Sequence, residues 1–165
     1  MSRLSQTCRS VVEQTAPERF FTADQADRSL VLIRRIVADV VTEFRCLLDQ
    51  QEVAEQASVA RCRVAHNRAQ EQIRQAFGRL ETFRDELHQV GAELKDWLRG
   101  VVHFPCLVGG QRAWLCWRYD EPHVKHWHYA ETSCADRQHL AQGPGEYQPA
   151  CRSVHEAVQS ARRVV

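Results

Sequence analysis

The residues best suited to chemistry lie close together, between positions 100 and 140. Five of the eight histidines and three of the four tryptophans lie in this stretch, along with the thiol of Cys116 and the carboxylate of Glu121. Imidazole and thiolate are preferred ligands of Zn²⁺ and similar transition metals, whereas imidazole and carboxylate are common general acids and bases. This stretch therefore holds the candidates for a metal centre or for a catalytic site.

The first half of the stretch predicts a β-hairpin that pairs an imidazole with a thiol. Gly109-Gly110 supplies the positive φ angles that a two-residue turn requires, and strand-like runs flank it on both sides. In this register His103 lies directly opposite Cys116 on one face of the hairpin. Pro105 cannot donate a ladder hydrogen bond, so we expect the first strand to lie at an edge or to carry a bulge.

The placement of the next two histidines depends on the second turn. An even-length turn around residues 120–123 pairs His126 with Trp117, and puts His126 and His128 on the face opposite Cys116. A one-residue bulge instead brings His126 onto the face of Cys116. With Zn²⁺ or another transition metal as the candidate cofactor, the candidate ligands are His103, Cys116, His126 and His128.

Two interpretations compete with a metal centre. In the structural one, the tryptophans pack against helices and the imidazoles find backbone partners, since no Cys-x-x-Cys or His-x-x-x-His spacing is present. In the other, the chain is a hydrolase in which Glu121 and His128 act as general acid and base. Asp120 and Glu121 lie in a turn, however, where carboxylates usually form caps or face solvent.

A long helical region precedes the predicted sheet. Thr22 and Gln25 match a capping box, which starts a helix near Ala23, and Gly91 suits the left-handed C-cap of a second helix. Apolar residues recur between them every three or four positions, as expected for amphipathic helices. The first stripe is Ala26, Leu30, Ile33, Val37, Val40, Val41, Phe44, Leu47 and Leu48; the second is Ile73, Phe77, Leu80, Leu87 and Val90, with Phe83 at its edge.

The two stripes must cover each other or a third element, so they predict an antiparallel hairpin. Neither proline nor glycine marks the reversal between residues 50 and 70, where Ser58 and Asn67 are the best local candidates. Because a helical pair this slender rarely buries both stripes, either the sheet packs along it or two copies associate. We expect a protein partner or a homodimer through the hairpin.

Composition excludes several classes of protein. The 22 basic residues nearly balance the 21 acidic ones, so no field favours nucleic acid. No stretch approaches the length of apolar chain that spans a membrane, and no membrane partner is expected. The seven cysteines form an odd, widely spaced set without a leader before them, which predicts a reduced, cytoplasmic protein.

These elements predict an α+β fold. It comprises a long antiparallel helical hairpin over residues 23–91, a small three-stranded antiparallel sheet over residues 100–130, and a short C-terminal helix. We expect an N-terminal arm over residues 1–20 and a single domain over residues 21–140. Residues 141–165 then form a C-terminal loop and the short helix.

Several short motifs also follow one another in order. They are Gly91-Ala-Glu-Leu-Lys-Asp96, Gly100-Val-Val-His-Phe-Pro105, Gly110-Gln-Arg112, Leu115-Cys-Trp-Arg118, Glu121-Pro122, Trp127-His128 and Arg137-Gln138. Over about residues 20–140 the chain resembles the prokaryotic family known as domain of unknown function 2203. The resemblance implies a fold and no established activity, substrate or cofactor. It singles out as motif residues Trp117, Arg118, Glu121, Trp127 and Arg137.

The chain departs from the pattern of that family at several positions. The family usually has Asp where this chain has His103 and Tyr129, Gly where it has Asp120, and a Gly-Phe-x-Gly-Arg run where it has Ser133 to Arg137. Two potential carboxylate ligands or bases are therefore absent. We predict a binding or assembly module without established enzymatic activity; the alternative is a metal-binding protein that uses His, Cys and Glu side chains of the sheet, and the hydrolase ranks third.

Overall fold

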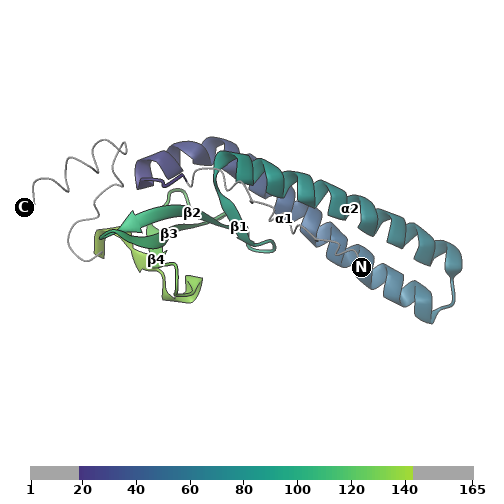
Figure 1. Cartoon of the computed structure of the whole chain (residues 1–165). Coiled ribbons are helices and arrows are strands. Elements are labelled where there is room, and N and C mark those ends of the chain that lie inside the picture. Colours follow the sequence, from purple (N-terminus) through teal and green to yellow (C-terminus); the bar gives the residue numbers. More distant parts are fainter. Residues whose placement is uncertain (1–18, 143–165) are drawn as a thin grey trace, which may run out of the picture.

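The computed structural model describes residues 19–142, which form two long helices followed by a five-stranded antiparallel sheet. Figure 1 shows the sheet at one end of the helical hairpin and the turn between the helices at the other. The elements are α1 (Ala23–Val59), α2 (Arg63–Val90), β1 (Glu93–Asp96), β2 (Val101–Val108), β3 (Gln111–Arg118), β4 (His126–Tyr129), the 3-10 turn η1 (Cys134–Asp136), β5 (Gln138–His139) and the 3-10 turn η2 (Leu140–Gln142). The α+β class and the hairpin are confirmed.

The ends of both helices follow from local sequence. At the start of α1, the Thr22 hydroxyl accepts from the Gln25 amide and the Gln25 side chain accepts from the Thr22 amide, so the predicted capping box is confirmed. At the end of α2, Gly91 has a φ of 90° and is the predicted left-handed C-cap. The reversal lies at residues 60–62, directly after the candidate Ser58, where Arg61 takes a positive φ of 54°.

Away from the sheet, the two helices pack through small residues. Ala54 and Ala57 of α1 are buried there, as are Ala69 and Ala76 of α2. Phe77, which we assigned to the buried stripe, is instead 52% exposed. At this point Ala76, rather than its neighbour Phe77, faces α1. A small side chain at this position lets the two helix backbones approach closely. Leu48 of the first stripe is likewise 41% exposed.

The sheet has the strand order β1-β2-β3-β4-β5, so the prediction of three strands was wrong. The two additional strands, β1 and β5, lie at its edges and are four and two residues long. Strands this short carry no alternation that periodicity could detect. The predicted C-terminal helix lies outside the described residues, and the last described element is the 3-10 turn η2.

The pairing of β2 with β3 follows the predicted register. Gly109 and Gly110 form the two-residue turn with φ values of 58° and 79°, and His103 pairs with Cys116. The expectation that Pro105 places β2 at an edge or in a bulge was wrong, because β2 lies between β1 and β3. The β1 pairing stops at His103, however, so Pro105 lies beyond its end.

The pairing of β3 with β4 follows the shifted register rather than the even-length turn. Cys116 pairs with His126, and Trp114 pairs with His128. Paired residues of an antiparallel ladder share a face, and so do residues two apart on one strand. All four of these side chains therefore lie on one face of the sheet, which we call the outer face.

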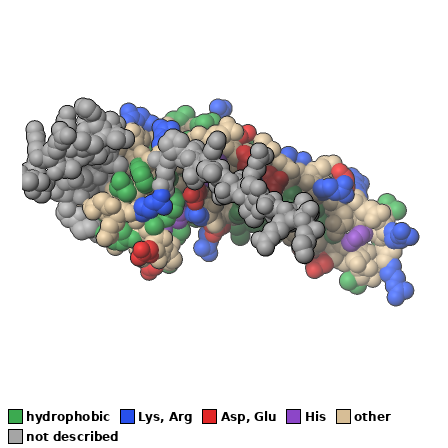
Figure 2. Space-filling model, viewed as in Figure 1, with side chains coloured by type: hydrophobic (Ala, Val, Ile, Leu, Met, Phe, Trp, Pro, Cys, Tyr) green, Lys and Arg blue, Asp and Glu red, His purple; other side chains and the backbone are tan. Residues whose placement is uncertain are grey.

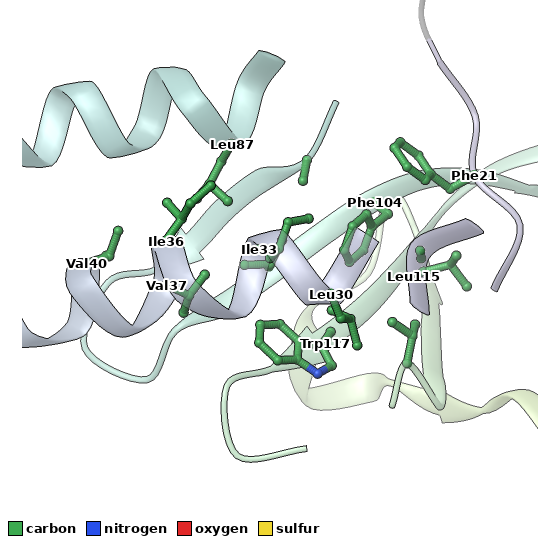
Figure 3. Packing of buried hydrophobic residues seen from close by; sticks show 14 of the residues in the cluster. Phe21, Leu30, Ile33, Ile36, Val37, Val40, Leu87, Phe104, Leu115 and Trp117 are labelled. Atoms are coloured by element: carbon green, nitrogen blue, oxygen red, sulfur yellow. The ribbon is translucent and has the colours of Figure 1, made fainter. Parts of the chain in front are cut away.

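The opposite face of the sheet carries the main core. Figure 3 shows Leu30 and Ile33 of α1 directed at Phe104, Leu115 and Trp117 of the sheet. These side chains are between 0 and 4% exposed. Burial of this apolar surface drives the docking of α1 on the sheet, and it leaves the outer face for other groups.

The loop between β3 and β4 is held by two charged residues of α1. The Arg34 guanidinium donates to the carbonyl oxygens of Tyr119, Glu121 and Pro122 at 3.1 to 3.4 Å and lies over the Trp117 ring. Two turns earlier on the helix, the Asp27 carboxylate accepts from the amide of Val124 at 2.7 Å. These contacts decide where the loop ends, and thereby the register of β4.

We expect Arg34→Ala to lower the free energy of unfolding by about 2 to 3 kcal/mol, because three carbonyl groups lose a charged donor. The exposed neighbour Arg35 offers a matched control, and Arg35→Ala should change stability by less than about 0.5 kcal/mol. Urea denaturation followed by circular dichroism measures both values. Equal losses in the two variants would contradict the anchoring role of Arg34.

Figure 2 shows basic and acidic side chains interspersed along the visible face of the hairpin. Within residues 19–142, neither long helix is apolar enough to cross a lipid bilayer.

Candidate metal centre

Four side chains with metal-binding atoms converge on the outer face of the sheet. They are His103 of β2, Cys116 of β3, His128 of β4 and Cys134 of η1, and one ligand atom from each lies within 4.8 Å of all the others. Three of them were candidates from the sequence, and the fourth was not. Two imidazoles with two thiols form the donor set typical of structural zinc sites.

Two close contacts within the cluster involve His103. Its Nε2 atom lies 2.9 Å from the Cys134 Sγ atom and 3.3 Å from the His128 Nε2 atom. In a tetrahedral zinc site with ordinary bond lengths, neighbouring ligand atoms are about 3.3 to 3.8 Å apart. The two imidazole nitrogens already have this spacing, and the longest separation must shorten by about 1 Å.

A hydrogen bond to the backbone orients the His128 ring so that the lone pair of its Nε2 atom points into the cluster. The Nδ1 atom of His128 lies 2.8 Å from the Tyr129 carbonyl oxygen, which can only accept, so Nδ1 carries the proton. The Nε2 atom of a neutral ring is then unprotonated and faces His103 and Cys134. A carbonyl partner of this kind commonly sets the tautomer of metal-binding histidines.

His103 is held neutral by its surroundings. Burial, the neighbouring His128 and the positive charge of Lys95 lower the pKa of His103 to about 3, in that order of importance. Only 3% of the side chain is exposed, and no hydrogen-bond partner for its Nδ1 atom lies among the described residues. Its ring stacks on Trp114 with 5.6 Å between centroids. A neutral imidazole is the form that binds metals.

Cys116 lies beside a guanidinium group. Burial and the nearby Cys134 raise the pKa of Cys116 to about 11, and the Arg137 side chain hydrogen-bonded to its sulfur opposes that rise. A divalent cation overrides this balance, because a coordinating thiol is deprotonated outright. Arg137 is then placed to stabilise the resulting thiolate, as groups hydrogen-bonded to ligands do in metal sites.

Arg137 is in turn positioned by Glu121. Its Nη2 atom lies 2.7 Å from the Glu121 Oε1 atom, and both side chains are largely buried, at 15% and 17% exposed. The second oxygen, Oε2, accepts from the Arg118 amide at 3.1 Å, while the Trp117 indole donates to the Glu121 carbonyl oxygen at 3.0 Å. The predicted motif residues around Glu121 thus support the cluster rather than enter it.

His126 and Trp127 take other places. His126 lies outside the four-residue cluster, although it is directly opposite Cys116; its Nδ1 atom is 3.4 Å from a Glu121 oxygen and its ring contacts His139. Burial is the main cause that lowers the pKa of His126, followed by the charge of Arg137. Trp127 packs in the main core on the other face.

The candidate hydrolase pair has different surroundings. The Glu121 carboxylate contacts Arg137, the Arg118 amide and His126, whereas His128 is directed at His103 within the cluster. The family that the chain resembles usually has Asp at the positions of His103 and Tyr129. His103 lies in the cluster. Tyr129 instead packs against Trp127 and the core.

Cys134 is the member of the cluster that sequence reasoning missed. It begins η1, whose start is capped by Ser133: the Ser133 hydroxyl accepts from the Ala135 amide and donates to the Asp136 carboxylate. This Ser-x-x-Asp pattern was a readable sign of a tight turn, and the turn precedes the Arg137-Gln138 motif. Neither the Ser-x-x-Asp pattern nor the Arg137-Gln138 motif reveals that the turn folds back over the outer face.

Comparison with known proteins agrees with the resemblance noted in the sequence. The profile of a family described as "Uncharacterized conserved protein (DUF2203)" matches residues 19–140, which is most of the chain. The protein belongs to the DUF2203 family. The DUF2203 match contains all four residues of the cluster, as well as Glu121 and Arg137. No curated protein and no solved structure matches the chain significantly.

Proposed function

We propose that this protein is a zinc-binding protein whose sheet is held together by one Zn²⁺ ion bound to His103, Cys116, His128 and Cys134. The single observation that supports this most strongly is the convergence of the four ligand atoms within 4.8 Å. The ligands come from four different elements of the fold. Two imidazole and two thiol donors on one largely buried patch suit a borderline-soft cation such as Zn²⁺.

The donor set favours zinc over other common ions. Thiolates and imidazoles are poor ligands for Mg²⁺ and Ca²⁺, which take oxygen. Two thiolates neutralise the charge of Zn²⁺, so a neutral site is buried rather than a charged one. The four protein ligands also fill a tetrahedral shell and leave no open position for water or substrate, which is the arrangement of structural sites.

The position of the site indicates what the ion does. The main core lies between α1 and the inner face of the sheet, and the segment that contains η1 brings Cys134 to the cluster on the other face. A zinc ion there ties β2, β3 and β4 to η1. It thereby takes the place of a second apolar core, which this short segment is too polar to form.

This proposal reverses the order of functions that the sequence favoured. The assembly role of the hairpin stays a prediction. The cytoplasmic location also stays a prediction.

The histidines of β4 provide a matched test. His128→Ala removes a ligand, whereas His126→Ala removes an imidazole two residues away on the same face that lies outside the cluster. Full-length protein purified without a histidine tag should contain one zinc per chain by elemental analysis. We expect His126→Ala to retain the metal and His128→Ala to lose most of it.

Two results would overturn the proposal. One is the absence of stoichiometric zinc, or of any other transition metal, in a folded wild-type protein that has been offered the ion. The other is equal metal content in both histidine variants. Circular dichroism of each variant establishes that the sheet is folded before its metal is measured.

A further inference from the structure

Two of the four proposed ligands are thiols that face each other from different elements. Cys116 lies on β3 and is fully buried, whereas Cys134 lies on η1 and is partly exposed. Their sulfur atoms lie within 4.8 Å of each other. Because reaction with a small solute requires access to the sulfur, Cys134 is the thiol that such a solute reaches first.

The setting of Cys134 allows the short movement that a bond would need. Its turn, η1, contains no buried residue and is held at the surface by contacts between Ser133 and Asp136. A disulfide brings two sulfur atoms to about 2 Å, so the Cys134 sulfur must move by no more than about 3 Å. The strand that carries Cys116 can stay in place.

The other cysteines of the described region lie elsewhere. Cys46 is exposed on α1, Cys62 is exposed in the turn between the helices, and Cys106 is buried with the main core on the opposite face of the sheet. Within residues 19–142, the cluster is therefore the place where two thiols meet.

We propose that hydrogen peroxide joins Cys116 to Cys134 in a disulfide and expels the zinc, which makes the site a redox-sensitive metal switch. The inference rests on the proposed zinc site and adds its regulation. Loss of both thiolates leaves two imidazoles, too few to hold the ion tightly. The disulfide then keeps η1 attached to β3, while η1 loses the connections to β2 and β4 that the zinc ion provides.

The reaction balances in two steps. The Cys134 thiolate attacks one oxygen of the peroxide, the O–O bond breaks, and hydroxide leaves to give a sulfenic acid. The Cys116 thiolate then attacks the Cys134 sulfur, the S–O bond breaks, and a second hydroxide leaves. Two thiolates lose two electrons in total, two protons from solvent convert the hydroxides into water, and zinc remains Zn²⁺ throughout.

The test uses the full-length, zinc-loaded protein. Its metal content is measured first, hydrogen peroxide is added, and released zinc is followed with a chromogenic chelator while peptide mapping under non-reducing conditions identifies the bonded cysteines. We expect release of the one zinc per chain together with a Cys116–Cys134 bond. Dithiothreitol followed by zinc should then restore the starting metal content.

Cys62→Ser is the matched control, because it removes an exposed thiol distant from the cluster. It should release zinc at the same rate as the wild type. Retention of zinc under peroxide, or release with sulfinic acids or another cysteine pair instead of the proposed bond, overturns the inference and leaves the zinc site standing. A protein that holds no zinc before peroxide is added overturns both proposals, and the initial metal measurement separates this case from the others.

Discussion

Chelation of zinc is expected to lower the midpoint of thermal unfolding by about 10 °C. An ion that binds only the folded state stabilises it by about 4 kcal/mol when its free concentration is a thousand times the dissociation constant. For a domain of this size, each kcal/mol shifts the midpoint by about 3 °C. The shift arises because the unfolded chain cannot gather the four ligands from β2, β3, β4 and η1.

Two buried cysteines separate the contribution of the metal from that of packing. Cys116 and Cys106 are both 0% exposed and lie on adjacent strands, but Cys106 is on the face that packs against α1. Burial raises the pKa of Cys106 to about 12, so its thiol stays protonated and inert. Replacement of either residue by alanine removes one buried sulfur.

Differential scanning calorimetry with and without a chelator then distinguishes the contribution of the metal from that of packing. The midpoint of Cys106→Ala should fall on chelation by as much as that of the wild type. The midpoint of Cys116→Ala should fall by only about 1 to 4 °C on chelation, because loss of one of four ligands weakens zinc binding by about 100- to 1,000-fold, the share of one ligand in a structural site. A chelator effect of equal size in both variants would contradict the site.

Gly100→Ala is expected to lower the free energy of unfolding by about 3 to 4 kcal/mol. Gly100 has a φ of 62°, where an L-residue costs about 1 to 2 kcal/mol. A Cβ atom there would lie 2.6 Å from Val37 Cγ1 of α1 and 2.9 Å from Tyr119 Cβ. Relief of that overlap must push α1 away from the sheet, which adds about 1 to 3 kcal/mol.

Gly110 provides the matched control for this substitution. Its φ of 79° is also positive, but a Cβ atom there has no heavy atom within 4 Å. Gly110→Ala should therefore cost only the backbone part, about 1 to 2 kcal/mol. Chemical denaturation of both variants measures the difference, and equal losses would show that the close approach of the sheet to α1 does not limit stability.

The structure also corrects the sequence-based view of the charged residues. Arg34 is a charged residue within a helical sequence, and the structure shows that it donates to three carbonyl groups of the loop before β4. Glu121 was a candidate catalytic group, yet its carboxylate positions Arg137 beside a cysteine ligand. The contacts of long charged side chains are difficult to predict from sequence, because their partners lie on other elements of the fold.

The sequence by itself determined the features that depend on neighbours along the chain. These include the capping box at Thr22, the left-handed cap at Gly91 and the two-residue turn at Gly109-Gly110. The last of these set the register that pairs His103 with Cys116, so half of the proposed metal site was readable in advance. Each follows from backbone conformations and hydrogen bonds within a few residues.

The tertiary structure alone decided the other half. His128 reaches the cluster because α1 holds the loop before β4 and so fixes the shifted register, and Cys134 reaches it because η1 folds back over the outer face. A shift of one residue in β4 would turn His128 to the other face without changing any local preference. Contacts between elements distant in the chain select one register and bring the last two ligands to the first two.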